Sequence, residues 1–171
     1  MKKWLALLCA CALLAAAAGC RKQPDDVPAP APADDPPAQT EQVNLYLPDG
    51  QAMYVIPTPM SLTTEDDMAP VLVNALISQG ALPVGVEVKG CTVENGQIAL
   101  DLNGAFADAV RENGTAGEIM LLASVVDTFL DYYDAQALTL TADGAVIETG
   151  HAIYDEPFTA LFEIEDAQAA Q

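Results

Sequence analysis

The longest regular pattern of apolar positions in the chain predicts a helix over residues 115–133. Apolar side chains recur there at steps of three and four, which places them on one face of a helix packed against a core: Ile119, Leu122, Ala123, Val126, Phe129, Leu130 and Tyr133. Thr115 and Glu118 have the spacing of a capping box, in which each side chain bonds to the other residue's backbone N–H. We therefore expect the helix to begin at Thr115, and Thr115→Ala to cost about 1 kcal/mol of stability.

Shorter apolar segments on both sides of this helix predict three β-hairpins. The segments of each pair are separated by a turn dipeptide, of which Asn95-Gly96 is the strongest hairpin signal. The expected strand pairs are 43–47 with 53–56, 86–93 with 97–102, and 137–141 with 145–148. Pro57 and Pro59 follow the first pair, and we expect them to end that hairpin.

Two further helices complete the predicted domain. One is expected from a cap at Asp67, through Pro70 in the first turn, to a glycine end at Gly80, and a short one over residues 105–112. Hairpins that alternate with two main helices predict an α+β fold, a mainly antiparallel sheet with these helices on one face.

The first 20 residues predict a lipoprotein leader, because two lysines precede an apolar run of 15 residues, too short for an ordinary membrane span. The run ends in Ala17-Ala18-Gly19-Cys20, which resembles a bacterial lipobox with Ala17 where Leu is usual. We expect residues 1–19 to be a signal peptide and Cys20 to carry acyl chains such as palmitate, which would hold the protein on the extracytoplasmic face of the cell membrane. The alternative is an ordinary secretory signal cut nearby.

Composition divides the rest of the chain into a linker, a domain and a tail. Residues 20–42 are rich in Pro and Asp and predict a disordered linker after the lipidated cysteine. The domain is expected over 43–158, followed by a polar tail over 159–171. The formal net charge is −19, and beyond residue 22 the chain has only Lys89 and Arg111 as basic residues. This charge excludes nucleic acid as a partner.

Taken in order, the predicted segments resemble the GerMN domain, a module of spore-formation and germination lipoproteins. The matching segments are the opening strand 43–47, the helix 75–80, the P-x-G … V-D-L-S core at 83–103, the E … I-V-x-T-L helix at 118–129, and the closing Asp143-Gly144 and Gly150-His151. Asn103 stands where the family has Ser, and one copy of the domain is present. The resemblance implies a non-catalytic domain similar in fold to ring-building modules, with a role in envelope assembly or in cell-wall or spore-cortex metabolism.

Several side chains are candidates for structural or interaction roles. Asp101 lies between the apolar positions of its strand, so we expect it to hold backbone N–H groups of the following turn. His151, next to Gly150, is expected to be a structural hydrogen-bonder, although it could bind a metal with Asp155 and Glu156.

Asp127, one helical turn before Asp131, is expected on a solvated helix face that could resemble a carboxylate site. Enzyme and metal motifs are absent from the sequence, so we expect no catalytic, cofactor or metal residues.

Three functions remain open at this level. The leading hypothesis is a lipid-anchored, non-enzymatic interaction module that binds an envelope protein complex or peptidoglycan, with self-association into a homo-oligomer left open. The second is a peptidoglycan hydrolase that uses a carboxylate pair as general acid and base. The third is a passive ligand-binding lipoprotein, which the scarcity of aromatic residues (6%) disfavours.

Overall fold

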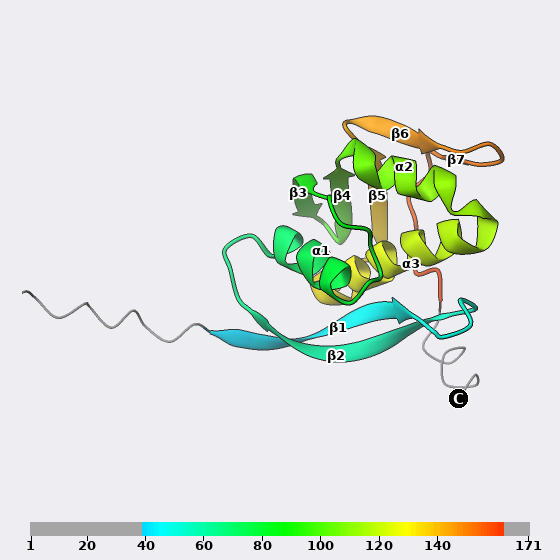
Figure 1. The fold of residues 1–171 in the computed structure, drawn as a ribbon. Coiled ribbons are helices and arrows are strands. Elements are labelled where there is room, and N and C mark those ends of the chain that lie inside the picture. Colours follow the sequence, from blue (N-terminus) through cyan, green and yellow to red (C-terminus); the bar gives the residue numbers. More distant parts are fainter. Residues whose placement is uncertain (1–38, 163–171) are drawn as a thin grey trace, which may run out of the picture. The chain divides into compact units, whose positions relative to one another are not determined.

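A computed structural model describes residues 39–162 of the chain (Figure 1). The expected signal peptide, Cys20, most of the linker and the end of the tail lie outside the described residues. The elements of the described range are β1 Thr40–Pro48, β2 Val55–Thr63, α1 Met68–Ser78, β3 Val88–Glu94, β4 Gln97–Leu102, α2 Gly104–Glu112, α3 Gly114–Tyr133, β5 Ala137–Ala142, β6 Ala145–Glu148 and β7 Ile153–Tyr154. The three hairpins and the helices therefore form where the sequence predicts them.

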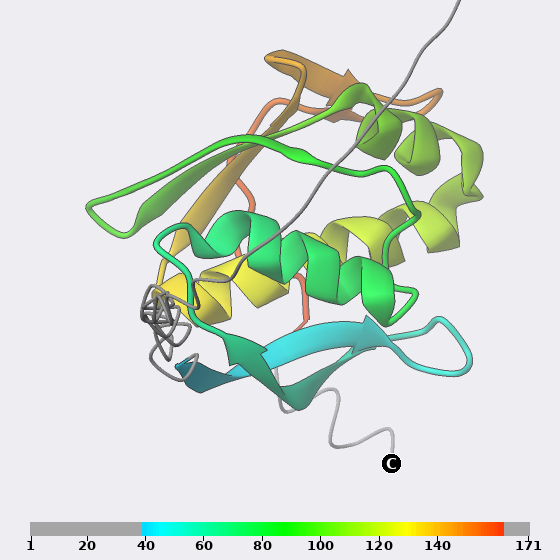
Figure 2. The same ribbon diagram turned by 60° about the vertical axis from the view of Figure 1, so that its left-hand side comes forward.

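The strands form two sheets, which confirms the α+β class and adds detail to it. Strands β1 and β2 make a two-stranded ribbon, and the other strands make a sheet in the order β3-β4-β5-β6-β7. All neighbours pair antiparallel except β4 and β5, which are parallel. A parallel pair needs a crossover connection, and α2 and α3 provide it. Figures 1 and 2 show α1 and α3 between the ribbon and the larger sheet, so the helices lie on one face of that sheet and the ribbon covers their other side.

Pro57 and Pro59 lie inside β2, so the expectation that they end the first hairpin is wrong. They pair with Tyr46 and Asn44 of β1. The backbone N–H of Tyr46 donates to the Thr128 hydroxyl of α3 at 2.9 Å, which means that it points away from β2. In an antiparallel pair both partners then face outward, so the ladder uses no N–H at residues 57 and 59. Proline is tolerated there because its missing donor is not needed.

Helix α1 begins and ends as the sequence predicts. The Asp67 side chain accepts a hydrogen bond from the Ala69 N–H at 3.1 Å, and Pro70 lies in the first turn. Gly80 adopts a φ of +76° just after the helix, a conformation that favours glycine.

The expected capping box of α3 does not form. The N-cap is Asn113, without a side-chain cap bond, and Gly114 with a φ of +61° turns the chain directly from α2 into α3. Thr115 is exposed within the first turn, whereas Glu118 is buried and faces away from the helix end. Since Thr115 caps nothing, we now expect Thr115→Ala to change stability by no more than about 0.5 kcal/mol.

Helix α3 is buried on all its sides, not only along the predicted stripe. Every residue from Met120 to Leu130 is buried. One side contributes to the main core with the sheet and α1, and another packs with Tyr46 and Val55 of the ribbon and with the partly buried Leu161 and Phe162. The described fold therefore runs from Thr40 in β1 to Leu161 and Phe162, which pack against α3. No helix in residues 39–162 is both long enough and apolar enough to cross a membrane.

A tyrosine joins the end of α3 to the start of β1. The Tyr132 hydroxyl at the end of α3 donates to the Glu41 carboxylate at the start of β1 at 2.7 Å. Burial, followed by this bond to Glu41, raises the pKa of Tyr132 from 10.0 to about 12.

Tyr132→Phe tests this contact by its dependence on alkaline pH. A group with a raised folded-state pKa contributes stability that is complete below its unfolded pKa and is lost as the pH rises through the folded pKa. The unfolding free energy of the native chain should therefore fall between pH 10 and about 12, and less steeply in Tyr132→Phe. Urea denaturation at several pH values, with tyrosinate absorbance as a second signal, measures the unfolding free energy of the native chain and of Tyr132→Phe. Identical slopes for the two proteins would contradict the contact.

Candidate functional site

The buried polar side chains of the described residues all belong to α3. They are Glu118, Ser124, Asp127 and Thr128, each no more than 3% exposed. A buried polar group lowers stability unless it is hydrogen-bonded, and a buried charge does so most. Glu118, Asp127 and Thr128 each bond to another segment of the chain, while the Ser124 hydroxyl has no partner within residues 39–162. Glu118, Asp127 and Thr128 are thus the residues through which α3 holds neighbouring segments of the chain.

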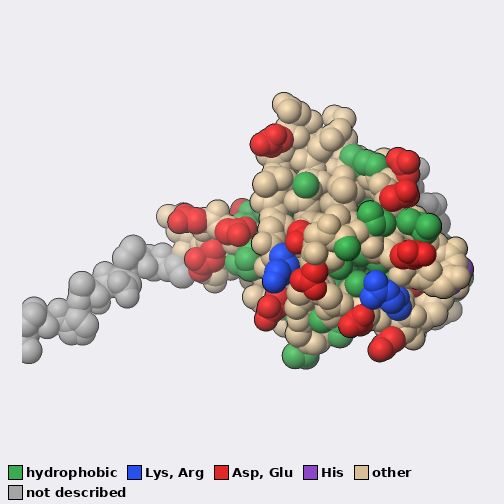
Figure 3. Space-filling view, turned by 90° about the horizontal axis from the view of Figure 1, so that it is seen from above, with side chains coloured by type: hydrophobic (Ala, Val, Ile, Leu, Met, Phe, Trp, Pro, Cys, Tyr) green, Lys and Arg blue, Asp and Glu red, His purple; other side chains and the backbone are tan. Residues whose placement is uncertain are grey.

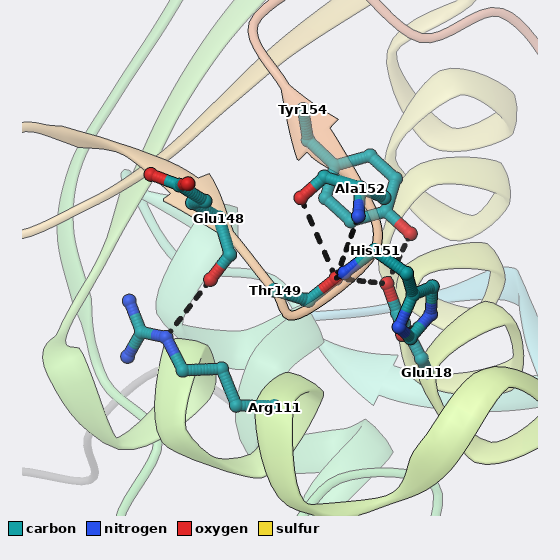
Figure 4. A network of polar contacts seen from close by, with 7 residues as sticks. All are labelled: Arg111, Glu118, Glu148, Thr149, His151, Ala152 and Tyr154. Carbon is teal, nitrogen blue, oxygen red and sulfur yellow. Dashed lines mark hydrogen bonds and ion pairs between the residues drawn. The ribbon is translucent and has the colours of Figure 1, made fainter.

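Glu118 forms the most highly connected cluster in the domain (Figure 4). Its Oε1 accepts hydrogen bonds from the Thr149 hydroxyl at 3.2 Å and from the Tyr154 hydroxyl, and its Oε2 lies 2.9 Å from His151 Nε2. The Glu118 side chain is 1% exposed and that of His151 is 51% exposed. One buried carboxylate therefore binds three side chains from a single segment, residues 149–154, which comprises the connection from β6 to β7 and strand β7 itself.

Local bonds shape that connection. The Thr149 hydroxyl accepts from the Ala152 N–H at 3.1 Å, and the Thr149 N–H donates to the Ala152 carbonyl at 2.9 Å. Arg111 of α2 donates from Nε to the Glu148 carbonyl at 3.0 Å and pairs with Asp108 on its own helix. Gly150 lies within this turn, where a Cβ atom would meet nothing within 4 Å.

The Glu118 cluster acts as a clamp, by which we mean a buried carboxylate that holds another segment of the chain through hydrogen bonds. Burial, followed by the bond to Glu118, raises the pKa of Tyr154, so its hydroxyl remains a donor. A general acid or base must reach a substrate, and the Glu118 side chain is almost wholly covered. His151 turns to Glu118 rather than acting as a ligand beside Asp155 and Glu156. Within residues 39–162, no three His, Cys, Asp or Glu side chains are grouped so that they could hold a metal ion.

Asp127 is a second clamp, and the expectation that it lies on a solvated helix face is wrong. Its side chain is buried, and its two carboxylate oxygens accept the N–H groups of Leu161 at 2.7 Å and Phe162 at 3.1 Å. The sequence analysis placed Leu161 and Phe162 in the polar tail over residues 159–171. Packing of that pair against α3 is what covers Asp127.

Asp131, the other member of the considered carboxylate pair, is exposed. Its carboxylate accepts from Asn44 Nδ2 at 3.2 Å and from the Tyr46 hydroxyl at 3.4 Å. Asp127 and Asp131 both line a shallow cleft together with Leu130, Gln136, Ala160 and Phe162. The two acids therefore do meet at one cleft, but both accept hydrogen bonds from the protein itself.

Asp101 holds a backbone N–H group, though not that of the turn after its own strand. Its Oδ1 accepts from the Thr141 hydroxyl at 2.7 Å and from the Gly144 N–H at 2.8 Å. The neighbouring turn residue Asp143 accepts in turn from the Gly104 N–H at 2.8 Å. The parallel pairing of β4 and β5, which the sequence did not predict, places Asp101 beside that turn.

Some residues of the site were missed by sequence reasoning. Thr149 and Tyr154 carry no spacing that points to Glu118, because the contact spans more than thirty positions in the chain. Thr128 left a signal, a hydroxyl inside an otherwise apolar stretch of a predicted buried helix.

Replacing Glu118 should be far more costly than replacing His151. Glu118→Ala removes the acceptor of several donors at a buried position, and we expect a loss of about 3 kcal/mol. His151→Ala breaks one half-exposed pair and should cost less than about 1 kcal/mol. Urea denaturation of both variants, with Glu118→Gln as the volume-matched control, tests the order. Equal losses for Glu118→Ala and His151→Ala would show that the clamp is not centred on Glu118.

Asp127→Asn should release the 158–162 segment, because an amide cannot accept both N–H groups. We expect a loss of about 1–3 kcal/mol and faster cleavage by chymotrypsin near Phe162. Asp131→Asn, one turn further along α3, is the matched control and should leave the cleavage rate unchanged. Similar rates in the two variants would argue against the clamp.

Comparison with known proteins gives a family and a fold. The matching family model is Germane, described as sporulation and spore germination, over residues 44–148. The first GerMN domain of the sporulation protein GerM from Bacillus subtilis is similar in structure, with a TM-score of 0.52 and 19% identity over 71% of this chain and 96% of that one. No protein with a curated description matches the chain.

Two further solved structures are more distant. The tandem GerMN domains of the same Bacillus subtilis protein give a TM-score of 0.46 and 15% identity, covering 75% of this chain and 47% of that one. A candidate lipoprotein from Clostridium perfringens gives 0.46 and 16%, covering 70% and 87%. Because the family match spans more than half of the 171 residues, the chain belongs to the Germane family of sporulation and spore germination, and its domain has the GerMN fold.

Proposed function

We propose that this protein is a membrane-anchored extracytoplasmic lipoprotein whose domain is a non-catalytic interaction module. It would act in envelope or spore assembly, or in cell-wall metabolism. The observation that most supports this role is the use of the buried carboxylates. Glu118 and Asp127 both bind segments of the domain itself, through side-chain donors and backbone N–H groups. This use of Glu118 and Asp127 supports an architectural role for the two carboxylates.

The leader sequence supports the anchor. An apolar run followed by Ala17-Ala18-Gly19-Cys20 fits a signal that is cut before a lipidated cysteine. The proline-rich residues after it would act as a spacer of about 3 Å per residue, which lets the domain reach partners away from the membrane surface. Acyl chains bury their methylene groups in the bilayer and provide the attachment.

The charge of the chain favours basic partners. Acidic residues outnumber basic ones 25 to 6, and the repulsion from anionic polymers follows from this. A protein partner with a basic surface would be attracted over several ångströms and would associate faster.

The alternative of a peptidoglycan hydrolase is favoured by one observation, the shared cleft of Asp127 and Asp131. That chemistry needs one of the two carboxyl groups to be protonated as the general acid. Both groups already accept hydrogen bonds from other residues of the domain. Asp131→Asn separates the two functions, because it would abolish hydrolysis of purified peptidoglycan and leave partner recovery by an interaction module intact.

Cys20→Ala should move the protein from the membrane fraction to the soluble fraction or the medium. The reason is that the thiol is the acylation site and, without acyl chains, the remaining chain has little affinity for lipid. Fractionation followed by immunoblotting measures the distribution. Cys91→Ala is the matched control and should remain with the membrane. Membrane attachment of Cys20→Ala would overturn the anchor.

The interaction role is tested by crosslinking in living cells that produce the tagged chain, followed by identification of what is recovered. Recovery of defined envelope proteins supports the module. Recovery of wall fragments alone, together with loss of wall hydrolysis in Asp131→Asn, would support the enzyme.

A further inference from the structure

The sheet edges in the described part of the chain are mostly blocked by their own sequence. On β2, Pro57 and Pro59 occupy positions that face outward. On β1, the Tyr46 N–H is taken by the Thr128 hydroxyl. Strand β7 has only two residues and is followed by Asp155-Glu156-Pro157. Proline, charge and short length are the devices that keep an edge from pairing with other chains.

Strand β3 has no such device along its middle, and its backbone faces outward there at two uncharged residues. Asn95 and Gly96, with φ of 53° and 73°, form a two-residue loop between Glu94 and Gln97. Such a loop is closed by a hydrogen-bonded pair, and hydrogen-bonded and non-bonded pairs then alternate. The register places Cys91 and Val93 in the non-bonded positions, so their N–H and C=O groups point away from β4. Neither backbone has another hydrogen-bond partner within residues 39–162.

The open part of this edge is short and well defined. The ladder shifts register between Val88 and Gly90, which places a bulge at Lys89, and Glu94 lies at the other end. Between them, residues 90–93 contain neither charge nor proline, and Val93 is 41% exposed. Figure 2 shows the β3–β4 hairpin projecting beyond the end of α1.

Shallow clefts adjoin β3 on both of its faces. On the outer face, two neighbouring clefts share Thr92, Ala99 and Thr139, small side chains that leave the sheet surface hollow. On the inner face, another cleft lies between α1 and the residues around Val88. Side chains of an added strand point alternately to the two faces, so both sets of clefts lie within their reach.

The charges around β3 are predominantly acidic. Glu87 and Glu94 are exposed near its two ends. The pKa of the Cys91 thiol is raised, first by burial and second by the negative charge of Asp67. The positive residue of this region, Lys89, lies 3.8 Å from Asp143. Figure 3 shows the same excess of acidic over basic side chains on one face of the domain. A partner at this edge should therefore carry positive charge.

We propose that β3 is a docking edge for an extended segment of a partner protein that carries lysine or arginine, and that this segment adds to the sheet beside Cys91–Val93. Backbone hydrogen bonds would provide the affinity, and the clefts and acidic neighbours would select the side chains. The inference rests on the proposed role as an interaction module and names the surface that performs it.

The test uses the detergent-extracted full chain and a fluorescein-labelled heptapeptide of alternating Lys and Val, with binding measured by fluorescence anisotropy. Val93→Pro removes an outward N–H without breaking the β3–β4 ladder, and should weaken binding about tenfold or more. A peptide with N-methylated amides on its pairing edge, and one with Glu in place of Lys, should both fail to bind.

A charge-matched pair of variants distinguishes binding at the β3 edge from non-specific attraction of a basic peptide to an acidic protein. Val93→Lys should weaken binding. Val146→Lys should not, because this similarly exposed valine lies on β6, which is paired with β5 on one side and β7 on the other. This pair also decides the matter if circular dichroism shows that Val93→Pro is unfolded. Equal binding by Val93→Lys and Val146→Lys would overturn the proposal.

Two other outcomes would also overturn the docking edge. The first is a dimer of the native chain that Val93→Lys dissociates in sedimentation velocity, because the edge would then serve self-pairing. The second is unchanged recovery of partners by Val93→Lys in the cellular crosslinking experiment. In that case the module role would stand and only its assignment to β3 would fall.

Discussion

The structure depends on the burial of α3 on all its sides. A helix that touches solvent along one face can place its polar residues there, but α3 has no such face between Met120 and Leu130. Its buried carboxylates must therefore find partners inside the protein, since an unpaired buried carboxylate would cost several kcal/mol. Glu118, Asp127 and Thr128 each meet this requirement by binding a segment that covers the helix.

These bonds explain why the domain closes around α3 as it does. Thr128 holds the ribbon through Tyr46, and Asp127 holds the last described residues through two backbone N–H groups. Glu118 holds the connection from β6 to β7. These polar bonds act together with the apolar contacts that the ribbon and the Leu161–Phe162 pair make with α3. Each of these buried polar groups thus binds a segment of the domain itself.

A family match and a shared fold do not identify a partner, because function belongs to particular surfaces. In this domain the surfaces differ in a physically defined way. Pro57 and Pro59 close the ribbon edge, whereas residues 90–93 of β3 leave backbone groups unpaired beside hollow sheet faces. Within residues 39–162, the open backbone groups of β3 beside acidic side chains would suit the basic, extended partner segment that we propose for this edge.

The sequence by itself determined the elements whose causes are local. Turn dipeptides such as Asn95-Gly96 set the hairpins, and Asp67 set the start of α1, because each acts within a few residues. Only the tertiary structure decided the partners of Glu118 and Asp127 and the place of Asp101 beside the Gly144 N–H. Thr115 and Glu118 have a capping spacing, yet Glu118 binds residues more than thirty positions away. A buried carboxylate takes the donors that the completed fold brings to it, and spacing along the chain cannot show which donors those will be.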